Sequence, residues 1–411
     1  MMMSSTMVTD QLKPNDLTYQ ILIVGGGISG TLAATVLGRA GYNVGLVDRY
    51  PEYPRDFRAE HLDGSMIEVL QRLDLLQDLT FGLYKGETVA LARRGRIVGE
   101  TGTLNFGLRY ETLVNRARAM LPGNVDVVTG RVTDIRTSET LQQIRLADGR
   151  RLRARLVVLA TGQGYGLARQ LGIRRHVLRE SHSLTFGFDI EPLDAPAFPH
   201  SFLVYQRERI ADRIDYLAAF TLGARTRINL FTYRQYREPW TRAFQVDPDP
   251  ALRELLPGLE RVLGPYRALR PVEARPVDLY VSEDYIRDGV VLIGDAFQVS
   301  CPATGMGMFR LLIDIEQLVT VHVPTWLQTP GMDRTKVAAF YHDPVKVACD
   351  AKALHDAEYR RSLSTEQGLR WRLHRARVGA TERVHAWRHR LPTARHPRIV
   401  DQPHPPSLAP G

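Results

Sequence analysis

The feature that most constrains this chain is an apolar run, residues 21–24, which breaks into glycines and continues as a helical pattern. The glycines match G-x-G-x-x-G at Gly25, Gly27 and Gly30, and Asp48 ends a second apolar run. In such a strand–turn–helix unit the first glycine permits a tight turn, the second lets backbone approach a pyrophosphate, and the third lets the helix pack closely. The helix N-terminus offers N–H groups and a positive dipole end to phosphates. The pattern predicts a dinucleotide site in which Asp48 binds a ribose diol.

Length and composition favour a globular protein of two or three domains. The chain has 411 residues, of which 44% are hydrophobic and 24% charged. The only cysteines are Cys301 and Cys349, which excludes a disulfide framework and indicates a reducing, cytoplasmic setting. The first 17 residues lack the apolar segment of a signal peptide and predict a flexible lead-in. No run approaches the roughly 18 apolar residues of a membrane span.

The formal net charge of +9 would assist the capture of an anionic cofactor. Nucleic acid is the other partner that such a charge suggests. The arginines interrupt most predicted elements instead of forming one stripe, and no nucleic-acid module is present, so we predict no nucleic-acid partner. The sequence also lacks the metal spacings H-E-x-x-H and C-x-x-C and the nucleophile elbow G-x-S-x-G, so we predict no metal site.

A second strand–loop–helix unit occurs near residues 289–310. An apolar run ends at Gly294 and Asp295, and a loop with Pro302, Gly305 and Gly307 then opens an apolar helix. An acid directly after a strand, followed by a glycine-rich loop, predicts a second ligand-binding edge built like the first. Between the two units, residues 176–275 alternate at period two and are rich in aromatic and β-branched residues, which predicts a mainly antiparallel sheet.

These motifs, in this order, resemble the flavin-dependent aromatic hydroxylases, the group that includes 4-hydroxybenzoate hydroxylase and the ubiquinone-pathway hydroxylases. The Gly294–Ala296 segment and the Pro302–Gly307 loop match the family's G-D-A and P-x-x-G-x-G patterns, and residues 58–66 resemble the segment after its ribose acid. The likeness extends over roughly residues 20–345. It implies an α/β fold: a Rossmann-type, glutathione-reductase-like FAD-binding domain, a mainly antiparallel β-sheet substrate domain and a C-terminal helical tail.

The resemblance also implies FAD as the cofactor. Reduced flavin in this family reacts with O2 to form a C4a-hydroperoxide, which transfers one oxygen atom to an electron-rich substrate, so no catalytic side chain is assigned. The substrate is expected to be a small hydrophobic or aromatic molecule. The implied cofactor-binding residues are Gly25, Gly27, Gly30, Asp48, Arg58, Arg109, Gly294, Asp295, Pro302, Gly305 and Gly307.

One segment departs from the family. Where its members have Asp-Gly-x-x-Ser, linked to both FAD and NAD(P)H, this chain reads Thr-Gly-Gln-Gly-Tyr at residues 161–165. The acid and the serine are missing, which leaves NADH or NADPH as the direct electron donor open. A separate flavin reductase is the alternative source of electrons.

The substrate is expected between the predicted sheet and the flavin. Aromatic side chains of that sheet are candidates to line the pocket, although half of any strand faces away. The candidates are Tyr205, Phe220, Phe231 and Tyr233.

The predicted domains are a lead-in over residues 1–17, an FAD-binding domain over 18–175 and 276–350, and a substrate domain over 176–275. Residues 351–411 form a basic helical region with a proline-rich, disordered end. Its apolar residues follow helical steps while arginines occupy the remaining surface. That pattern indicates a helix docked on the body, and weak contact with a membrane surface or an acidic partner is the alternative.

Three other functions fit parts of the sequence. A flavin-dependent halogenase would share the fold, but the chain lacks the segment Trp-x-Trp-x-Ile-Pro. An FAD-linked reductase or dehydrogenase is the second alternative, and a non-catalytic escort-type protein is the third. The intact glycine fingerprint with Asp48 argues against the escort function.

Overall fold

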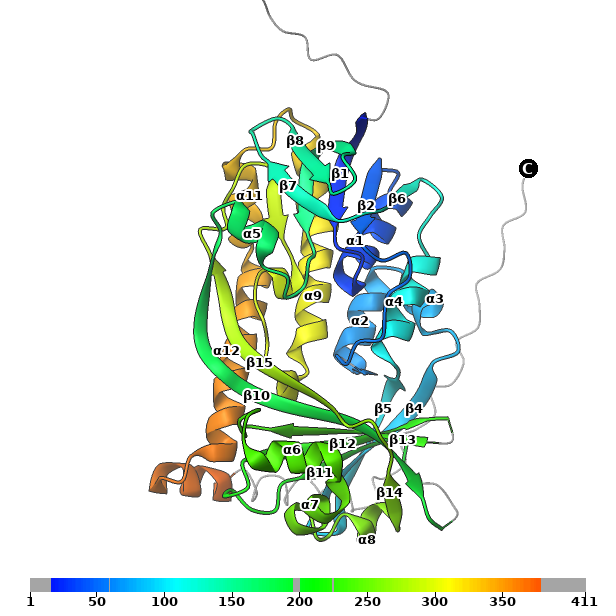
Figure 1. Ribbon diagram of the computed structural model, residues 1–411, viewed down its shortest axis with the longest axis vertical. Helices are drawn as coiled ribbons and strands as arrows, with labels where there is room; N and C mark the ends of the chain where they lie inside the picture. Colours follow the sequence, from blue (N-terminus) through cyan, green and yellow to red (C-terminus); the bar gives the residue numbers. More distant parts are fainter. Residues whose placement is uncertain (1–15, 59, 195–199, 224, 378–411) are drawn as a thin grey trace, which may run out of the picture. The chain divides into compact units, whose positions relative to one another are not determined.

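The computed structural model describes residues 16–58, 60–194, 200–223 and 225–377. One compact unit ends at Gln367, and a second begins at Gly368. The second unit is described only to residue 377 and is helical over 369–377. Most of the predicted basic helix, its proline-rich end and nearly all of the predicted lead-in lie outside the described residues. The first unit is a mixed α/β fold built on two sheets (Figure 1).

The first sheet has seven strands, in the order β6-β2-β1-β9-β8-β7, with β16 also pairing with β9. Its strands are β1 (Asp16–Val24), β2 (Val44–Asp48), β6 (Val125–Thr129), β7 (Val132–Arg136), β8 (Gln142–Leu146), β9 (Arg151–Leu159) and β16 (Val290–Leu292). β1, β2, β6, β9 and β16 are parallel, and Val24 lies in register with Val47 and Leu159. The parallel register brings the turns after β1, β2, β9 and β16 to the same edge.

The second sheet has nine strands, in the order β14-β10-β13-β12-β11-β4-β5-β3, with β15 pairing with β10. Its strands are β3 (His61–Leu62), β4 (Tyr84–Arg93), β5 (Arg96–Gly107), β10 (Arg174–Pro192), β11 (Phe202–Gln206), β12 (Ile214–Leu222), β13 (Arg225–Thr232), β14 (Tyr266–Ala268) and β15 (Glu273–Glu283). The β4–β5 hairpin belongs to this sheet because β4 pairs with β11. The chain therefore enters the second sheet well before residue 176, where the sequence predicts its start.

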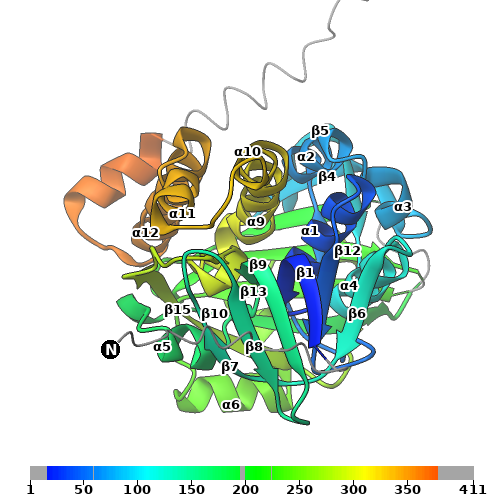
Figure 2. The same ribbon diagram turned by 90° about the horizontal axis from the view of Figure 1, so that it is seen from above.

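Helices cover both sheets. They are α1 (Ile28–Arg39), α2 (Gly64–Arg72), α3 (Leu76–Thr80), α4 (Tyr110–Ala119), α5 (Gly166–Gln170), α6 (Pro239–Val246), α7 (Pro248–Leu255), α8 (Glu260–Leu263), α9 (Met306–Glu316), α10 (Val323–Leu327), α11 (Arg334–Tyr341) and α12 (Pro344–Thr365). Figure 2 shows α1, α9 and α10 on one side of the first sheet. α12 crosses the predicted domain boundary at residue 350 without a break. None of these described helices is long and apolar enough to span a bilayer.

A buried charge cluster fixes the turn after β16. Asp314 accepts a hydrogen bond from the backbone N–H of Gly294 at 2.9 Å and forms an ion pair with Lys346 at 2.7 Å. Arg310 and Lys346 also pair with Asp350, at 3.2 and 2.9 Å. The cluster balances two cations with two carboxylates, as buried charges require. Through it, α9 and α12 hold the Gly294–Asp295 turn in place.

His182 makes stability sensitive to mild acid. Its ring is fully buried, and burial lowers its pKa from 6.5 to about 4, while Glu358 raises that pKa and Arg361 and Arg179 lower it. Between these pH values the unfolded chain binds more protons, so His182 favours the folded state above about pH 6.5 and loses that contribution as pH falls towards 4. The free energy of unfolding should fall between pH 7 and pH 4.5. We expect this fall to be about 1–3 kcal/mol smaller in His182→Leu than in the wild type.

The measurement is urea unfolding at both pH values. His355→Leu is the matched control, because His355 is exposed on α12. Equal acid sensitivity of the wild type and His182→Leu would contradict the assignment.

Candidate active site

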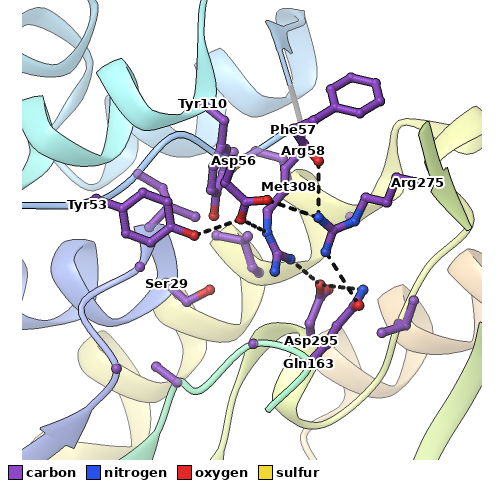
Figure 3. A pocket seen from close by; sticks show the side chains of 18 of the residues that line it. Ser29, Tyr53, Asp56, Phe57, Arg58, Tyr110, Gln163, Arg275, Asp295 and Met308 are labelled. Carbon is purple, nitrogen blue, oxygen red and sulfur yellow. Dashed lines mark hydrogen bonds and ion pairs between the residues drawn. The ribbon is translucent and has the colours of Figure 1, made fainter. Parts of the chain in front are cut away.

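A cavity of about 700 Å³ is lined by residues of both sheets (Figure 3). Its first wall comprises the turns after β1, β2 and β9 together with residues 53–58, 60, 61 and 63. Its second wall is one face of the second sheet, and the segment 299–308, with the Pro302–Gly307 loop, completes it. The cavity therefore joins the parallel strand ends, where α/β proteins bind ligands, to an antiparallel sheet face.

The glycine fingerprint shapes the first wall. Gly25 has φ +111°, and a Cβ built there would lie 2.4 Å from the carbonyl oxygen of Ala160. A Cβ on Gly30 would lie 1.9 Å from the carbonyl oxygen of Gly25, so Gly30 lies behind the wall as a packing residue. Gly27 does line the cavity, and its nearest neighbour would be Tyr53 at 3.9 Å. The fold itself needs Gly25 and Gly30, whereas Gly27 leaves free space in the cavity.

Asp48 lines the same wall with its carboxylate held in place. The carboxylate accepts hydrogen bonds from the backbone N–H of Gly26 at 2.6 Å and of Tyr50 at 2.8 Å. The guanidinium of Arg118 lies 3.3 Å away. Because these contacts orient an acid at the end of β2, the position suits a ribose diol.

Arg58 lines the cavity and contacts acids from two distant segments. Its guanidinium donates to Asp56 at 2.6 Å and to Asp295 at 3.1 Å, and Asp295 lies 237 positions after Arg58 in the sequence (Figure 3). Burial alone would raise the pKa of Asp56, but Arg58 and Arg275 lower it below its usual value. Asp56 is therefore a carboxylate at neutral pH.

Gln163 and Arg275 close this network into a ring. Arg275 donates to Asp56 at 3.0 Å and to the side-chain oxygen of Gln163 at 3.4 Å, while the Gln163 amide donates to Asp295 at 3.5 Å (Figure 3). Two arginines face two aspartates, which leaves no net charge. Gln163 belongs to the segment that departs from the family pattern, and here its amide serves as both donor and acceptor.

Besides Gly30, two predicted cofactor residues do not line the cavity, Arg109 and Gly294. The Arg109 guanidinium contacts Asp189 at 2.6 Å and Glu60 at 3.6 Å. These two carboxylates engage the Arg109 guanidinium, and Arg109 is not among the residues that line the cavity. Its contact with the cofactor stays a prediction. Gly294, with φ +61°, lies behind the wall, and its Cβ would meet the Ser29 hydroxyl at 2.7 Å. The other predicted positions at the wall are Pro302, Gly305 and Gly307.

Strand alternation separates the predicted pocket residues. Phe220 and Phe231 line the cavity, but Tyr205 and Tyr233 do not, which corrects those two predictions. Tyr205 points to the opposite face of β11, where it donates to Glu208 at 2.6 Å. Tyr233 lies just beyond β13 and donates to buried Asp215 at 3.2 Å.

Other residues of this wall were missed from the sequence. Phe202 pairs with Phe220 across β11 and β12, and Tyr216 pairs with Phe231 across β12 and β13. Period-two counting from Phe220 finds Tyr216, whereas Phe202 requires the strand register. His61 stacks on Phe202 with ring centroids 4.0 Å apart. Because this contact joins distant segments, no local sequence pattern predicts it.

Tyr216 connects the sheet wall to the Pro302–Gly307 loop. Its hydroxyl donates to the carbonyl oxygen of Ala303 at 3.1 Å. Since a neutral hydrogen bond contributes about 0.5–1.5 kcal/mol, we expect Tyr216→Phe to weaken FAD binding by about 2- to 12-fold. Fluorescence titration of the apoprotein with FAD measures this, with Tyr236→Phe, at an exposed tyrosine, as the control. Unchanged affinity in Tyr216→Phe would show that the bond does not position the loop.

Comparison with known proteins defines the class. The family described as FAD binding domain matches residues 18–320. The chain belongs to this family, and it is an FAD-dependent oxidoreductase of the monooxygenase type. The predicted family resemblance and the FAD cofactor are confirmed. The cavity fits this cofactor, because it combines an open glycine turn, an oriented acid and a glycine-rich loop.

Individual relatives are more distant. The chain is 23% identical over 333 residues to 6-hydroxynicotinate 3-monooxygenase of Bordetella bronchiseptica, covering 75% of this chain and 84% of that protein. It is 26% identical over 205 residues to tetracycline 7-halogenase of Kitasatospora aureofaciens, covering 42% and 36%. In structure it is similar to p-nitrophenol 4-monooxygenase PnpA of Pseudomonas putida DLL-E4, with a TM-score of 0.71, 18% identity and coverage of 90% and 94%.

Proposed function

We propose that this protein is an FAD-dependent monooxygenase that hydroxylates a small, hydrophobic aromatic compound. The observation that carries the proposal is the continuity of one cavity, which unites the glycine turn and Asp48 with the aromatic face of the second sheet. A cofactor and an aromatic substrate can therefore meet without leaving the protein. The names of the relatives, which include monooxygenases of hydroxynicotinate and nitrophenol, support the same reaction class.

In this proposal Gly25, Gly27 and the N-terminus of α1 bind the pyrophosphate of FAD, and Asp48 binds its adenosine ribose. Asp295, held by Arg58, accepts hydrogen bonds from the ribityl hydroxyls. Gly294 and Gly30 act indirectly, through the backbone turns that they permit. The finer fold, a Rossmann-type, glutathione-reductase-like domain, is part of the same proposal.

When bound, FAD would supply the redox chemistry, in which O2, two electrons and two protons convert one substrate C–H bond into a hydroxyl and form one water. The protein's own residues bind the substrate, orient it and exclude water. Phe220 and Phe231 provide apolar surface for the aromatic ring, and buried Met308 and Val299 extend that surface from the loop side. No protein nucleophile takes part in this mechanism.

The electron source is tested by comparing donors. Residues 161–165 lack the acid and the serine of the family's segment, so we propose that reduced flavin comes from a separate reductase. We expect NADH and NADPH to bleach the bound flavin no faster than buffer does, and a flavin reductase with NADH to support product formation. Rapid anaerobic bleaching by NADPH alone would reject this donor while leaving the oxygenase proposal intact.

A halogenase is the second candidate, supported by the partial likeness to tetracycline 7-halogenase. The two functions differ in the atom that is added to the ring. Assays with reduced flavin, O2 and 100 mM-scale chloride or bromide distinguish them by product mass. A halogenated product at a yield above that of hydroxylated product would favour the halogenase.

A further inference from the structure

The helix α12 contacts the Pro302–Gly307 loop from outside the cavity. Its buried residue Ala357 and its partly buried Leu354 belong to one apolar cluster with Cys301 and Ala303, at the start of the loop. No residue of α12, which the structure describes in full, lines the cavity. The helix can therefore influence the loop without contacting a ligand in the cavity.

The strand β12, which α12 also contacts, has a β-bulge at Asp215. Ile214 pairs with Thr232 and Tyr216 pairs with Phe231, so Asp215 is the extra residue between them. A bulge changes the direction of the side chains around it, and bulges are common next to active sites. The bulge explains how two consecutive residues of one strand can contact the same helix.

Arg360 of α12 contacts both residues of the bulge. Its guanidinium lies 3.4 Å from the carboxylate of Asp215, and its Cζ lies 5.3 Å from the centre of the Tyr216 ring. Asp215 is only 2% exposed. Its other partners are Arg207, Ser364 and Tyr233, at 3.5, 3.1 and 3.2 Å. Because Asp215 is buried among these partners, it holds the Arg360 guanidinium beside the Tyr216 ring.

Tyr216 connects Arg360 to the cavity. Its ring lines the cavity next to Phe231, and its hydroxyl donates to the carbonyl oxygen of Ala303 at 3.1 Å. Burial raises the pKa of this hydroxyl, Arg360 lowers it, and Asp215 raises it. A cation over an aromatic ring attracts the electrons of that ring, which makes a phenol hydroxyl a stronger donor. Arg360 therefore strengthens the hydrogen bond from Tyr216 to Ala303.

We infer that Arg360 is a positioning residue for the cofactor: through Tyr216 it holds the Pro302–Gly307 loop in the conformation that binds FAD. The inference rests on the proposed placement of FAD beside this loop, and not on the reaction that FAD supports. Arg360 does not line the cavity, and its side chain is 39% exposed, so it acts on the cofactor through another residue and does not fill the core.

Fluorescence titration of the apoprotein with FAD tests this role. We expect Arg360→Gln to weaken FAD binding by about 2- to 5-fold, the effect of a partly exposed cation over an aromatic ring. Arg360→Lys keeps a cation beside Asp215 and Tyr216, so it should bind FAD with wild-type affinity. Lys352→Gln is the matched control and should change nothing, because Lys352 lies on the same helix and is 62% exposed.

A double-mutant cycle tests whether Arg360 acts through Tyr216. Tyr216→Phe keeps the ring and removes only the hydroxyl that bonds to Ala303. In the Tyr216→Phe background, Arg360→Gln should therefore weaken FAD binding by less than about 1.5-fold. At saturating FAD, the visible absorption band of the bound flavin should shift in the same direction in both single variants. A general loss of stability would not cause that shift.

Urea unfolding of each apoprotein separates positioning from folding. If Arg360→Gln does not fold, Asp215→Asn/Arg360→Gln, which removes both charges together, takes its place in the titrations. Wild-type FAD affinity in the folded variant, no recovery in Arg360→Lys, or effects of Arg360→Gln and Tyr216→Phe that simply multiply would each overturn the inference.

The inference and the proposed function can fail separately. Weaker FAD binding with the expected coupling, in a protein that oxygenates no aromatic compound, would reject the proposed function alone. Oxygenation of an aromatic compound by this protein, together with unchanged FAD binding in Arg360→Gln, would reject the inference alone.

Discussion

Gly27→Ala is expected to weaken FAD binding while the apoprotein stays folded. A Cβ at Gly27 finds no protein atom closer than 3.9 Å, but it enters the cavity where backbone must approach the pyrophosphate. Overpacking of this kind costs about 1–3 kcal/mol, which corresponds to roughly 5- to 150-fold weaker binding. Alanine is also a poorer N-cap than glycine for α1, so the apoprotein should lose at most about 1 kcal/mol.

Two further glycine variants are controls for Gly27→Ala. Gly30→Ala would place a Cβ 1.9 Å from the backbone oxygen of Gly25, so we expect loss of both folding stability and FAD binding. Gly123→Ala has no atom within 4 Å of its Cβ and should change neither. FAD titration and urea unfolding of the apoproteins measure the two effects. If Gly27→Ala bound FAD with wild-type affinity, the fingerprint would not contact the cofactor.

Arg227→Leu is expected to destabilise the fold by about 3–5 kcal/mol at neutral pH. Arg227 is 1% exposed and pairs with Glu60, Glu273 and Asp189, at 2.7, 2.7 and 3.3 Å. Its removal leaves buried carboxylates without their main counter-charge. Urea unfolding of the holoenzyme and of the apoprotein measures the loss.

The pH dependence of this variant has a definite sign. Burial raises the pKa of Glu60 above its usual value of 4.5 even though Arg227 lowers it, so removal of Arg227 should raise it further. A group with a raised folded pKa favours folding below its unfolded pKa and loses that contribution as pH rises. The loss of folding stability caused by Arg227→Leu should therefore become smaller as pH falls from 7 towards 4.5.

Arg225→Leu is the control for the lost charge. Arg225 lies on the same strand but is 61% exposed, 3.9 Å from Asp189, so its removal should cost less than about 1 kcal/mol. Equal losses from Arg225→Leu and Arg227→Leu would show that the buried network contributes no special stability.

The cofactor half of the site could be predicted because its determinants are local. Glycine spacing, an acid at a strand end and a glycine-rich loop are each contained in a short segment, and Gly25, Gly27, Asp48 and Asp295 all line the cavity. Gly30 lies behind the wall, as its predicted packing role requires. Arg109 is not among the lining residues, and its ion pair with Asp189 could not be predicted because Asp189 belongs to a distant strand.

The substrate half could be predicted only in outline. The period-two pattern indicates a sheet, but the register decides which face each aromatic residue occupies, and so Tyr205 and Phe220 separate. The β4–β5 hairpin joins this sheet by parallel pairing with β11, more than 100 residues later in the sequence. His61 enters the wall through a second pairing, in which β3 is antiparallel to β5.

Incorporation of labelled oxygen tests whether this protein is a monooxygenase. Holoenzyme is supplied with reduced flavin, an aromatic substrate and ¹⁸O2 in ordinary water, and the mass of the product is measured by mass spectrometry. We expect a product that carries one ¹⁸O atom, no label when the isotope is supplied as H2¹⁸O, and less product with Gly27→Ala. A product that carries its new oxygen from water, or substrate that is oxidised without gaining oxygen, would contradict a monooxygenase.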